Sequence, residues 1–401
     1  RESGQEVFFN TGTDEHGQKI AEAAAKAGIE VEAYVDHYAA EFEKLKSEFD
    51  LSNDTFIRTT HAGHIEAAKE MWRRCEGAGD IYKKTYTGLY CTGCEAFKTE
   101  KEVVKGHCEL HPTLELQEIA EENYFFRFSK YQDKLLAYLE NKESIVPDWR
   151  RKEAVKFVKA GLEDFSISRE AARLSWGIPV PGDDAQVMYV WFDALTNYVS
   201  TLGWPADEKG LFKKFWEEGH VLQMAGKDQV RFQSLMWQAM LISAGVKNTD
   251  QVFYHGFITS GGQKMSKSIG NVINPFDIIG RYGVDTLRYI LLRHMSPAED
   301  GDLTEETIRE HYTAHLVNGL GNLVARVMKL AEDNLPHPVE LTEEDTKVEQ
   351  AFIDLAENFK FNEAMDLVFE HITKADRYMT RKKPYTLIKS GDTVEREEAR
   401  A

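Results

Sequence analysis

Two lysines and two serines lie within a glycine-rich stretch from Gly261 to Asn271, and this combination suits the binding of a polyphosphate. Glycines let the backbone approach an anion closely because they carry no side chain. The ammonium groups of Lys264 and Lys267 supply positive charge, and the hydroxyl of Ser266 can donate a hydrogen bond to a phosphate oxygen. Any isolated pair of lysines can instead belong to a solvated basic loop that binds no ligand. Motifs in the rest of the chain are therefore needed to distinguish a polyphosphate site from such a loop.

A second cluster carries metal chemistry. Cysteine and histidine occur in two short knuckles, Cys91-x-x-Cys94 and Cys108-x-x-His111, which are separated by 13 residues. Thiolate sulfur and imidazole nitrogen are ligands of tetrahedral zinc, and a site filled by four protein ligands is structural. The spacing therefore predicts one structural Zn²⁺ site rather than four unrelated residues. The remaining cysteine, Cys75, is expected to be a buried thiol on a helix.

A third stretch could bind a ligand at the end of a strand. Residues 6–11 predict a strand, residues 12–17 a glycine-containing turn and residues 18–27 a helix that stops at a glycine. Strand, turn and helix in this order often form a ligand-binding junction in α/β proteins. A Walker A loop is excluded, because Gln18 and Lys19 stand where it needs lysine and then serine or threonine.

Composition limits the classes of protein that the chain can belong to. Lysine and arginine number 49 against 67 aspartate and glutamate residues, a net charge of -18, which argues against a protein that coats nucleic acid through its overall charge. Contacts with RNA would then be local, at basic patches such as residues 150–152 and 381–383. No apolar run approaches the roughly 20 residues of a membrane span, and no signal peptide is recognisable. Few, clustered cysteines suit a reducing compartment, so we expect a cytoplasmic enzyme.

The elements around these stretches are of two kinds. Helical stripes at residues 31–49 and 63–77 flank a strand at residues 54–60, a pattern typical of a parallel sheet covered by helices. From residue 304 onward no strand pattern remains, and helices with short connections predict an antiparallel bundle. At 401 residues the chain is long enough for about two to three domains. The sequence thus predicts an α/β domain followed by an all-α domain.

Taken together, the motifs resemble those of the methionyl-tRNA synthetases, a family of class I aminoacyl-tRNA synthetases. The resemblance covers essentially the whole chain, and the motifs stand in the family's order at residues 12–17 (G-T-D-E-H-G), 91–111, 164–169 (D-F-S-I-S-R), 190–198, 226–237, 261–271 (with K-M-S-K-S) and 321–326. It implies a Rossmann-like catalytic domain in two parts, an inserted zinc-bearing connective domain and a helical anticodon-binding domain. The corresponding residues are 1–84 with 166–303, 85–165 and 304–401.

The resemblance implies a site for L-methionine. It assigns Asp14 to the amino group of the amino acid and Arg169 to its carboxylate. Taken alone, an aspartate before a helix is more often a cap, and a single arginine is more often part of a surface ion pair. Trp191, Ala194 and Tyr198 are expected to wall an apolar slot, where a thioether sulfur gains ~0.3 to 1.5 kcal/mol beside each aromatic ring.

An ATP site, with Mg²⁺ accompanying the nucleotide, is implied as well. The residues expected near ATP are His16, Gly226 and Asp228, together with Lys264, Ser266 and Lys267 of the glycine-rich stretch at residues 261–271, which we call the lysine loop. The two lysines would neutralise charge that develops on the triphosphate during adenylation, as positioned cations do in phosphoryl chemistry.

Three glutamines depart from the family's pattern. Gln229 replaces an apolar residue, Gln238 replaces a proline, and Gln233 stands where the family has a pocket histidine. An amide can still donate and accept hydrogen bonds, so Gln233 is retained as a methionine contact. The effect of the three departures on methionine affinity is left open by the sequence.

His61 and His64 form an H-x-G-H sequence that is similar to the family's phosphate-binding signature. In the family that signature precedes the G-T-D-E-H-G turn, whereas here it follows the turn. We therefore interpret the match as chance and expect the signature, with the first strand, to lie upstream of Arg1. We likewise expect the helical domain to continue beyond Ala401. Without the upstream segment, half of the phosphate clamp would be lacking and the chain would be inactive.

In the helical part, the resemblance implies contacts with the anticodon of tRNA(Met). Asn322 and Arg326 are four residues apart and share one face of the predicted helix. Tyr385 stands where the family has tryptophan and can stack on an unpaired base. An ordinary bundle surface is the alternative for all three residues.

Two other interpretations stay open. Synthetases for leucine, isoleucine, valine or cysteine share the lysine loop, and an apolar pocket discriminates by only ~1 to 3 kcal/mol per methylene. A non-catalytic tRNA-binding relative would account for the three glutamines. The zinc knuckles and the 12–17 turn favour methionine, and Asp14, Arg169 and Lys267 favour catalysis. We therefore predict a methionine–tRNA ligase that forms methionyl-adenylate and charges tRNA(Met), with no DNA or membrane partner.

Overall fold

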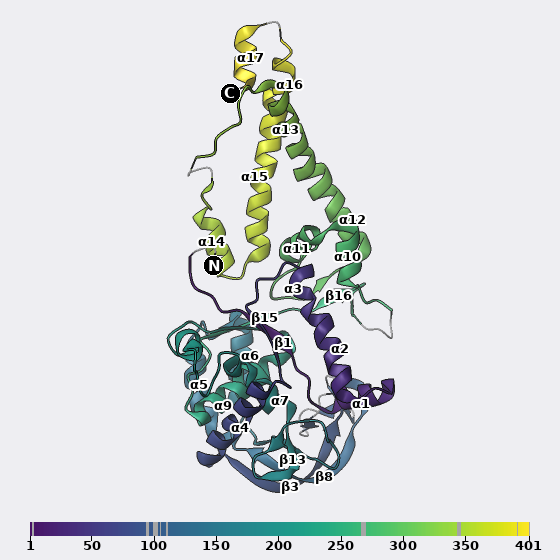
Figure 1. Cartoon of the computed structure of the whole chain (residues 1–401), viewed down its shortest axis with the longest axis vertical. Coiled ribbons are helices and arrows are strands. Elements are labelled where there is room, and N and C mark those ends of the chain that lie inside the picture. The colour runs from purple at the N-terminus through teal and green to yellow at the C-terminus, as the bar shows by residue number, and fades with distance from the viewer. Residues whose placement is uncertain are drawn as a thin grey trace. The chain divides into compact units, whose positions relative to one another are not determined.

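The computed structural model describes residues 1, 4–93, 96–98, 103–104, 106–109, 111–265, 270–342, 346–390 and 392–400. The chain divides into two compact units, Arg1–Tyr254 and His255–Ala401 (Figure 1). The division falls before the lysine loop, whereas the sequence predicted a boundary at residue 304. The loop therefore belongs to the same unit as the C-terminal helices.

The strand that leads into the glycine-containing turn pairs with one other strand of the first unit. β1 and β2 pair in parallel with Asn10 opposite Thr55. A Cβ atom on Gly12 would lie 1.9 Å from the carbonyl oxygen of Ile57, so only glycine fits where the strands approach. The predicted helix stop at Gly28 is confirmed, since this residue caps α1 with a φ of 68°. The elements of this part are β1 (Asn10–Thr13), α1 (Gln18–Ala27), α2 (Val31–Glu43), α3 (Leu45–Glu48), β2 (Thr55–Arg58) and α4 (Ala62–Gly77).

A second set of strands runs in the order β14-β15-β9, and Val252 of β15 lies opposite Ile145 of β9 in a parallel pair. Because β9 falls within residues 85–165, part of the predicted insertion belongs to this sheet. The elements are α5 (Gln132–Glu140), β9 (Ile145–Val146), α6 (Asp148–Lys159), β14 (Leu222–Gly226), η4 (Lys227–Gln229), η5 (Phe232–Met236), α9 (Trp237–Ala244) and β15 (Gln251–His255).

The remaining strands that the structure describes in the first unit form three antiparallel sheets. A four-stranded sheet has the order β10-β8-β3-β4, and two three-stranded sheets have the orders β5-β6-β7 and β11-β13-β12. Strands β3 and β8 pair along most of their length, with Ile81 opposite Phe126 and Tyr90 opposite Gln117. The strands are β3 (Ile81–Cys91), β4 (Ala96–Lys98), β5 (Val103–Val104), β6 (His107–Cys108), β7 (His111–Glu115), β8 (Gln117–Phe126), β10 (Phe165–Ser166), β11 (Ser168–Glu170), β12 (Pro179–Val180) and β13 (Asp183–Met188).

The core of the first unit fixes the short helix α7 (Val190–Ala194) against α4. Trp72 on α4 is fully buried, and its ring makes edge contacts with Phe192 at 5.4 Å and Tyr124 at 5.3 Å between centroids. Aromatic pairs of this geometry contribute about 0.5–1.5 kcal/mol beyond their buried area. The neighbours of Phe192 on α7 are thereby held in place.

The second unit begins with a small sheet and continues with helices. Thr304 caps α12, because its side chain accepts from the backbone nitrogen of Thr307. None of the helices in the described ranges combines the length and the apolar character that a bilayer crossing requires. The elements are β16 (Ile258–Ser260), β17 (Gln263–Lys264), α10 (Pro275–Tyr282), α11 (Val284–Arg293), β18 (Gly301–Asp302), α12 (Glu305–His311), the π-helix η6 (Tyr312–Gly321), α13 (Asn322–Asn334), α14 (Gln350–Glu357), α15 (Phe361–Lys382), α16 (Pro384–Leu387) and α17 (Thr393–Arg400).

Candidate active site

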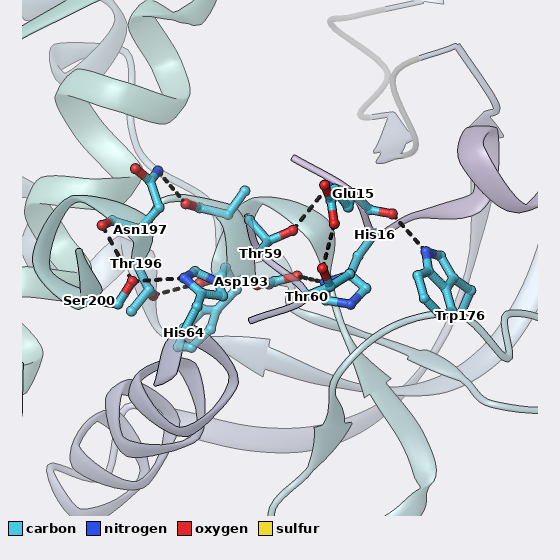
Figure 2. A network of polar contacts seen from close by, with 12 residues as sticks. Glu15, His16, Thr59, Thr60, His64, Trp176, Asp193, Thr196, Asn197 and Ser200 are labelled. Atoms are coloured by element: carbon cyan, nitrogen blue, oxygen red, sulfur yellow. Dashed lines mark hydrogen bonds and ion pairs between the residues drawn. The ribbon is translucent and has the colours of Figure 1, made fainter. Parts of the chain in front are cut away.

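A buried aspartate connects three segments that lie far apart in the sequence. Asp193 on α7 is 1% exposed. Its Oδ2 lies 2.6 Å from Nδ1 of His16, and its Oδ1 lies 2.7 Å from Nε2 of His64 (Figure 2). Nδ1 of His64 is in turn 2.9 Å from Oγ of Ser200. These contacts fix the ring of His16 at the end of the glycine-containing turn.

Asp193 is ionised in the folded protein. Burial acts to raise its pKa, but hydrogen bonds from His16 and His64 outweigh burial and hold the pKa below its ordinary value of 3.8. A carboxylate has no proton to give, so both imidazole nitrogens donate to it. The bond from Nδ1 orients the ring of His16 and leaves Nε2 available for a further contact.

Glu15 anchors the same turn from inside the fold. Its carboxylate is 2% exposed and accepts from Nε of Arg58 at 2.7 Å. The hydroxyls of Thr13 and Thr60 donate to the same carboxylate. An ionised group can be buried at little cost only when it is paired in this way. The preceding residue, Asp14, is exposed and faces a cavity.

This cavity has a volume of about 370 Å³ and opens beside the turn. The turn at the end of β1, the segment from α7 to α8 (Asn197–Ser200), the end of β14 and η5 contribute to its wall. Five residues that the sequence predicted for the methionine site line it: Asp14, Trp191, Ala194, Tyr198 and Gln233. Its size is in the range of pockets that hold small organic ligands.

Two of the three glutamines that depart from the family's pattern, Gln233 and Gln238, have hydrogen-bond partners, whereas Oε1 of Gln229 is buried without one among the described residues. Gln233 donates from Nε2 to Oε1 of Gln223 at 2.6 Å, and its Oε1 accepts from the hydroxyl of Tyr198 at 3.3 Å. Gln238 is fully buried and donates to the backbone oxygen of Gln233 and to Oγ1 of Thr249. Gln233 and Gln238 therefore belong to a buried polar network, which satisfies groups that would otherwise be costly to bury.

Arg169 lies in a different cavity. Its guanidinium donates from one terminal nitrogen to Oγ of Ser166 at 2.9 Å and to the backbone oxygen of Ser168 at 2.6 Å. It lines a cavity of about 400 Å³ together with Phe232, whose ring stacks on Trp191 with the centroids 4.3 Å apart. Since Trp191 lines the other cavity, the structure does not bring Arg169 together with the remaining methionine residues.

The residues expected near ATP are distributed over both units. Gly226 ends β14 and Asp228 is exposed in η4, directly after residues of β14 that line the cavity. Lys264 is exposed at the end of β17 in the second unit. Ser266 and Lys267 lie outside the described residues.

Comparison with known proteins places the chain in a family. The family model described as tRNA synthetases class I (M) matches residues 1–118 and 114–328. The methionine–tRNA ligase of Rhizobium meliloti is 40% identical over 405 residues, which make up 97% of this chain and 78% of the relative. The chain belongs to the methionyl-tRNA synthetase family.

Other relatives agree with this assignment. The methionine–tRNA ligase of Thermotoga maritima is 39% identical over 404 residues, which cover 97% of this chain and 63% of the relative. The Mycobacterium tuberculosis methionyl-tRNA synthetase in complex with methionyl-adenylate superposes with a TM-score of 0.89 at 38% identity, covering 99% of this chain and 80% of that one. The family member described here therefore has the class I synthetase α/β fold and spans 63–80% of the length of these relatives.

Three of the four predicted zinc ligands of this synthetase-family chain gather at one point. The Nδ1 atom of His111 lies 3.7 Å from Sγ of Cys91 and 4.0 Å from Sγ of Cys108. A Cβ atom on Gly93 would be 2.5 Å from the His111 ring, so the first knuckle needs glycine to admit the imidazole. Two thiols and an imidazole are a donor set that fits Zn²⁺. Cys94, the fourth predicted ligand, lies outside the described residues.

The three candidate anticodon residues lie on two helices of the second unit, α13 and α16. Asn322 is exposed at the start of α13, and Tyr385 on α16 is 46% exposed. Arg326 donates to Oδ1 of Asp376 on α15 at 3.2 Å, so its guanidinium is already in an ion pair. Nothing in these contacts distinguishes an anticodon surface from an ordinary bundle surface.

The sequence motif of His64 did not predict its contact with Asp193. Its match to a phosphate-binding signature was interpreted as chance, and the structure shows His61 exposed while His64 is 1% exposed and bonded to Asp193. One signal was available: His64 precedes Ala68 by four residues and so shares the inward face of the helix. That face predicts burial, and a buried histidine needs a polar partner.

Proposed function

We propose that the protein is a cytoplasmic methionine–tRNA ligase that activates methionine with ATP and transfers it to tRNA(Met). The observation that carries the proposal is the cavity of about 370 Å³, in which Asp14, Trp191, Ala194, Tyr198 and Gln233 meet in a chain about 40% identical to methionine–tRNA ligases. A carboxylate and aromatic rings in one pocket suit the ammonium group and the thioether of methionine.

In this proposal Asp14 binds the amino group, and the wall of Trp191, Ala194 and Tyr198 receives the side chain. Arg169 is retained as the ligand of the carboxylate, because a buried guanidinium can form two charge-assisted hydrogen bonds with it. A narrow cavity that Arg169 shares with Gly17 supports this role, since Gly17 ends the same turn that carries Asp14. The carboxylate then attacks the α-phosphate of ATP, which gives methionyl-adenylate and pyrophosphate.

The nucleotide is proposed to bind along the ends of β1 and β14. His16 would contact ATP through Nε2, because its other ring nitrogen, Nδ1, is bonded to Asp193. Gly226 and Asp228 would lie beside the ribose, and Lys264, Ser266 and Lys267 would neutralise phosphate charge. Mg²⁺ would enter with ATP and bind its phosphates.

A structural Zn²⁺ ion is proposed at Cys91, Cys94, Cys108 and His111. The convergence of the three described ligands and the requirement for Gly93 beside His111 support it. Such an ion crosslinks β3 to the small sheet of β5, β6 and β7, which is too small to have a hydrophobic core of its own. Binding of the tRNA(Met) anticodon by Asn322, Arg326 and Tyr385 is proposed on the family resemblance alone.

Charging of tRNA(Met) by the full-length protein tests the proposal. With ATP, magnesium and labelled methionine, we expect label on tRNA(Met) and none on tRNA(Leu) or tRNA(Val). The Asp14→Asn variant should charge more slowly through a raised KM for methionine, because an amide pairs less strongly with an ammonium group. A folded protein that binds tRNA(Met) but charges none would support the non-catalytic alternative instead.

A further inference from the structure

Three histidines of the second unit gather at one point, and none belongs to the motifs above. His294 directly follows α11, His311 ends α12, and His315 lies four residues later in η6. The ring centroids of His294 and His311 are 3.6 Å apart, and those of His294 and His315 are 5.2 Å apart. One ring nitrogen from each residue lies within 4.8 Å of the other two.

We propose that His294, His311 and His315 bind a divalent transition-metal ion, and that Zn²⁺ is the ion the site fits best. Zinc binds imidazole nitrogen at about 2.0–2.1 Å and accepts three histidines with water in the fourth position. His311 and His315 stand at i and i+4, the spacing that puts two imidazoles on one face of a helix in zinc proteins. Three nitrogen donors without a carboxylate disfavour Mg²⁺ and Ca²⁺.

The rings would need to move little to enclose an ion. Nitrogens on one tetrahedral zinc ion lie about 3.3–3.4 Å apart at those bond lengths, and here the three lie within 4.8 Å of one another. The parallel rings of His294 and His311 would tilt so that both lone pairs point at the ion. All three residues are partly exposed, so an ion and its water have access.

Tyr289 on α11 orients two of the three rings. Its hydroxyl lies 3.1 Å from Nε2 of His294 and 2.9 Å from Nδ1 of His315. It also accepts from a terminal nitrogen of Arg293 at 2.8 Å. A histidine that binds a metal ion through one ring nitrogen usually has its other ring nitrogen in a hydrogen bond of this kind. Tyr289 is 6% exposed and thus itself fixed by packing.

The charged group nearest the three histidines is positive and therefore opposes the binding of a cation, but an ion pair offsets its charge. Arg293 carries the positive charge, and its Nε lies 2.8 Å from Oδ1 of Asp366 in an ion pair. Without a metal, the cluster would be a stack of neutral aromatic rings on Tyr289 and Phe369, which is the competing explanation. With a metal, the end of α11 would be crosslinked to α12 and to the π-helix η6, a type of helix that is frequent at functional sites.

Zinc content of the full-length protein tests the proposal. After saturation with Zn²⁺ and gel filtration, His311→Gln should hold one equivalent of zinc fewer per chain than the wild type. His337→Gln changes an exposed histidine of the same unit outside the cluster and should lose none. Cys91→Ser removes zinc from the cysteine cluster, so the two losses should add in the double variant. Equal zinc in wild type and His311→Gln would overturn the proposal.

A second readout covers the possibility that His311→Gln does not fold. Wild-type protein with its cysteine cluster filled by zinc is titrated with Co²⁺, and the visible spectrum should show tetrahedral cobalt without a thiolate charge-transfer band. Tyr289→Phe should weaken this binding about 10–100-fold, since it removes the group that orients two ligands. A protein that takes up no cobalt outside the cysteine cluster has the ring stack and no metal site.

Discussion

At the scale of single residues, the geometry of the candidate site depends on how Asp193 holds His16 and His64. The aspartate is buried, ionised and shared by two imidazoles that come from different segments. A carboxylate in this position has two oxygens that accept, whereas an amide has only one. The side chain is therefore matched to its two donors.

Asp193→Asn tests this match. One imidazole nitrogen would face an NH₂ group instead of an acceptor, and a buried donor without an acceptor costs about 1–3 kcal/mol. We expect the free energy of unfolding to fall by that amount in urea titrations and the rate of adenylate formation to fall with it. Asp184→Asn, which alters an exposed aspartate nearby, is the control. A variant as stable and active as the wild type would show that the candidate site does not depend on the Asp193 carboxylate.

Gln233 offers a test of the pocket itself. Replacement by leucine keeps the volume but removes the bonds to Tyr198 and Gln223. In the proposed site the amide also contacts bound methionine, and loss of one hydrogen bond of about 0.5–1.5 kcal/mol should raise KM for methionine about two- to tenfold. The value of kcat should change little, because the lost interaction is made equally in ground and transition states. Steady-state exchange kinetics that show an unchanged KM would place Gln233 outside the methionine site.

At the scale of elements, Asp80 ties the end of α4 to two neighbouring helices. The side chain is fully buried and accepts from Nζ of Lys130 at 2.6 Å, from the hydroxyl of Tyr131 and from Oγ of Ser243 at 2.8 Å. Burial raises its pKa, but the bonds from Lys130, Tyr131 and Ser243 outweigh burial and lower the pKa below 3.8. The junction is therefore stabilised by a charged group.

Asp80→Asn should destabilise the first unit by about 1–3 kcal/mol at pH 7. The folded carboxylate binds a proton less readily than the unfolded one, so its contribution is fully present above pH 3.8 and is lost as pH falls through the folded pKa. Urea titrations should therefore show the difference between wild type and variant shrinking below pH 3.8. Glu140→Gln, an exposed change on α5, should show no such dependence. A difference that stays constant down to the lowest measurable pH would contradict the assignment.

Cys75 tests how tightly α4 and α9 pack. Burial raises the pKa of its thiol to about 12, and its Sγ lies 3.8 Å from the backbone oxygen of Met240. The thiol therefore stays protonated and inaccessible, which makes it a poor nucleophile. In native protein, iodoacetamide at pH 8 should therefore spare Cys75, whereas protein unfolded in urea should be modified at this residue. Peptide mass spectrometry that finds Cys75 modified as fast in native as in unfolded protein would show the helices to be loosely packed.

At the scale of the whole molecule, features set by neighbours in sequence were predictable and features set by distant partners were not. Gly28 stops α1 because a left-handed residue is a local requirement, and the knuckles of Cys91 and Cys108 follow from short spacing. His64 was missed because its partners, Asp193 and Ser200, lie 129 and 136 residues away. No periodicity or spacing reports a contact over that distance.

The division of the chain into two compact units also depends on contacts between distant residues. The change of pattern from strands to helices predicts a domain boundary at residue 304, and contacts separate the two units between Tyr254 and His255. A short pairing decides this, because β16 of the lysine-loop sheet pairs with β18 at residues 301–302 rather than with strands of the first unit. Such pairing depends on tertiary contacts that a local pattern does not contain.

In the proposed function, the cavity beside Asp14 selects methionine for activation. The most direct measurement is amino-acid-dependent exchange of labelled pyrophosphate into ATP by the full-length protein, with methionine, leucine, isoleucine, valine and cysteine compared at equal concentrations. We expect exchange with methionine at a kcat/KM at least about tenfold above that of each other amino acid. Tenfold is the lower end of the discrimination that one methylene gives in an apolar pocket. Faster exchange with another amino acid, or none from a folded protein, would contradict the proposed function.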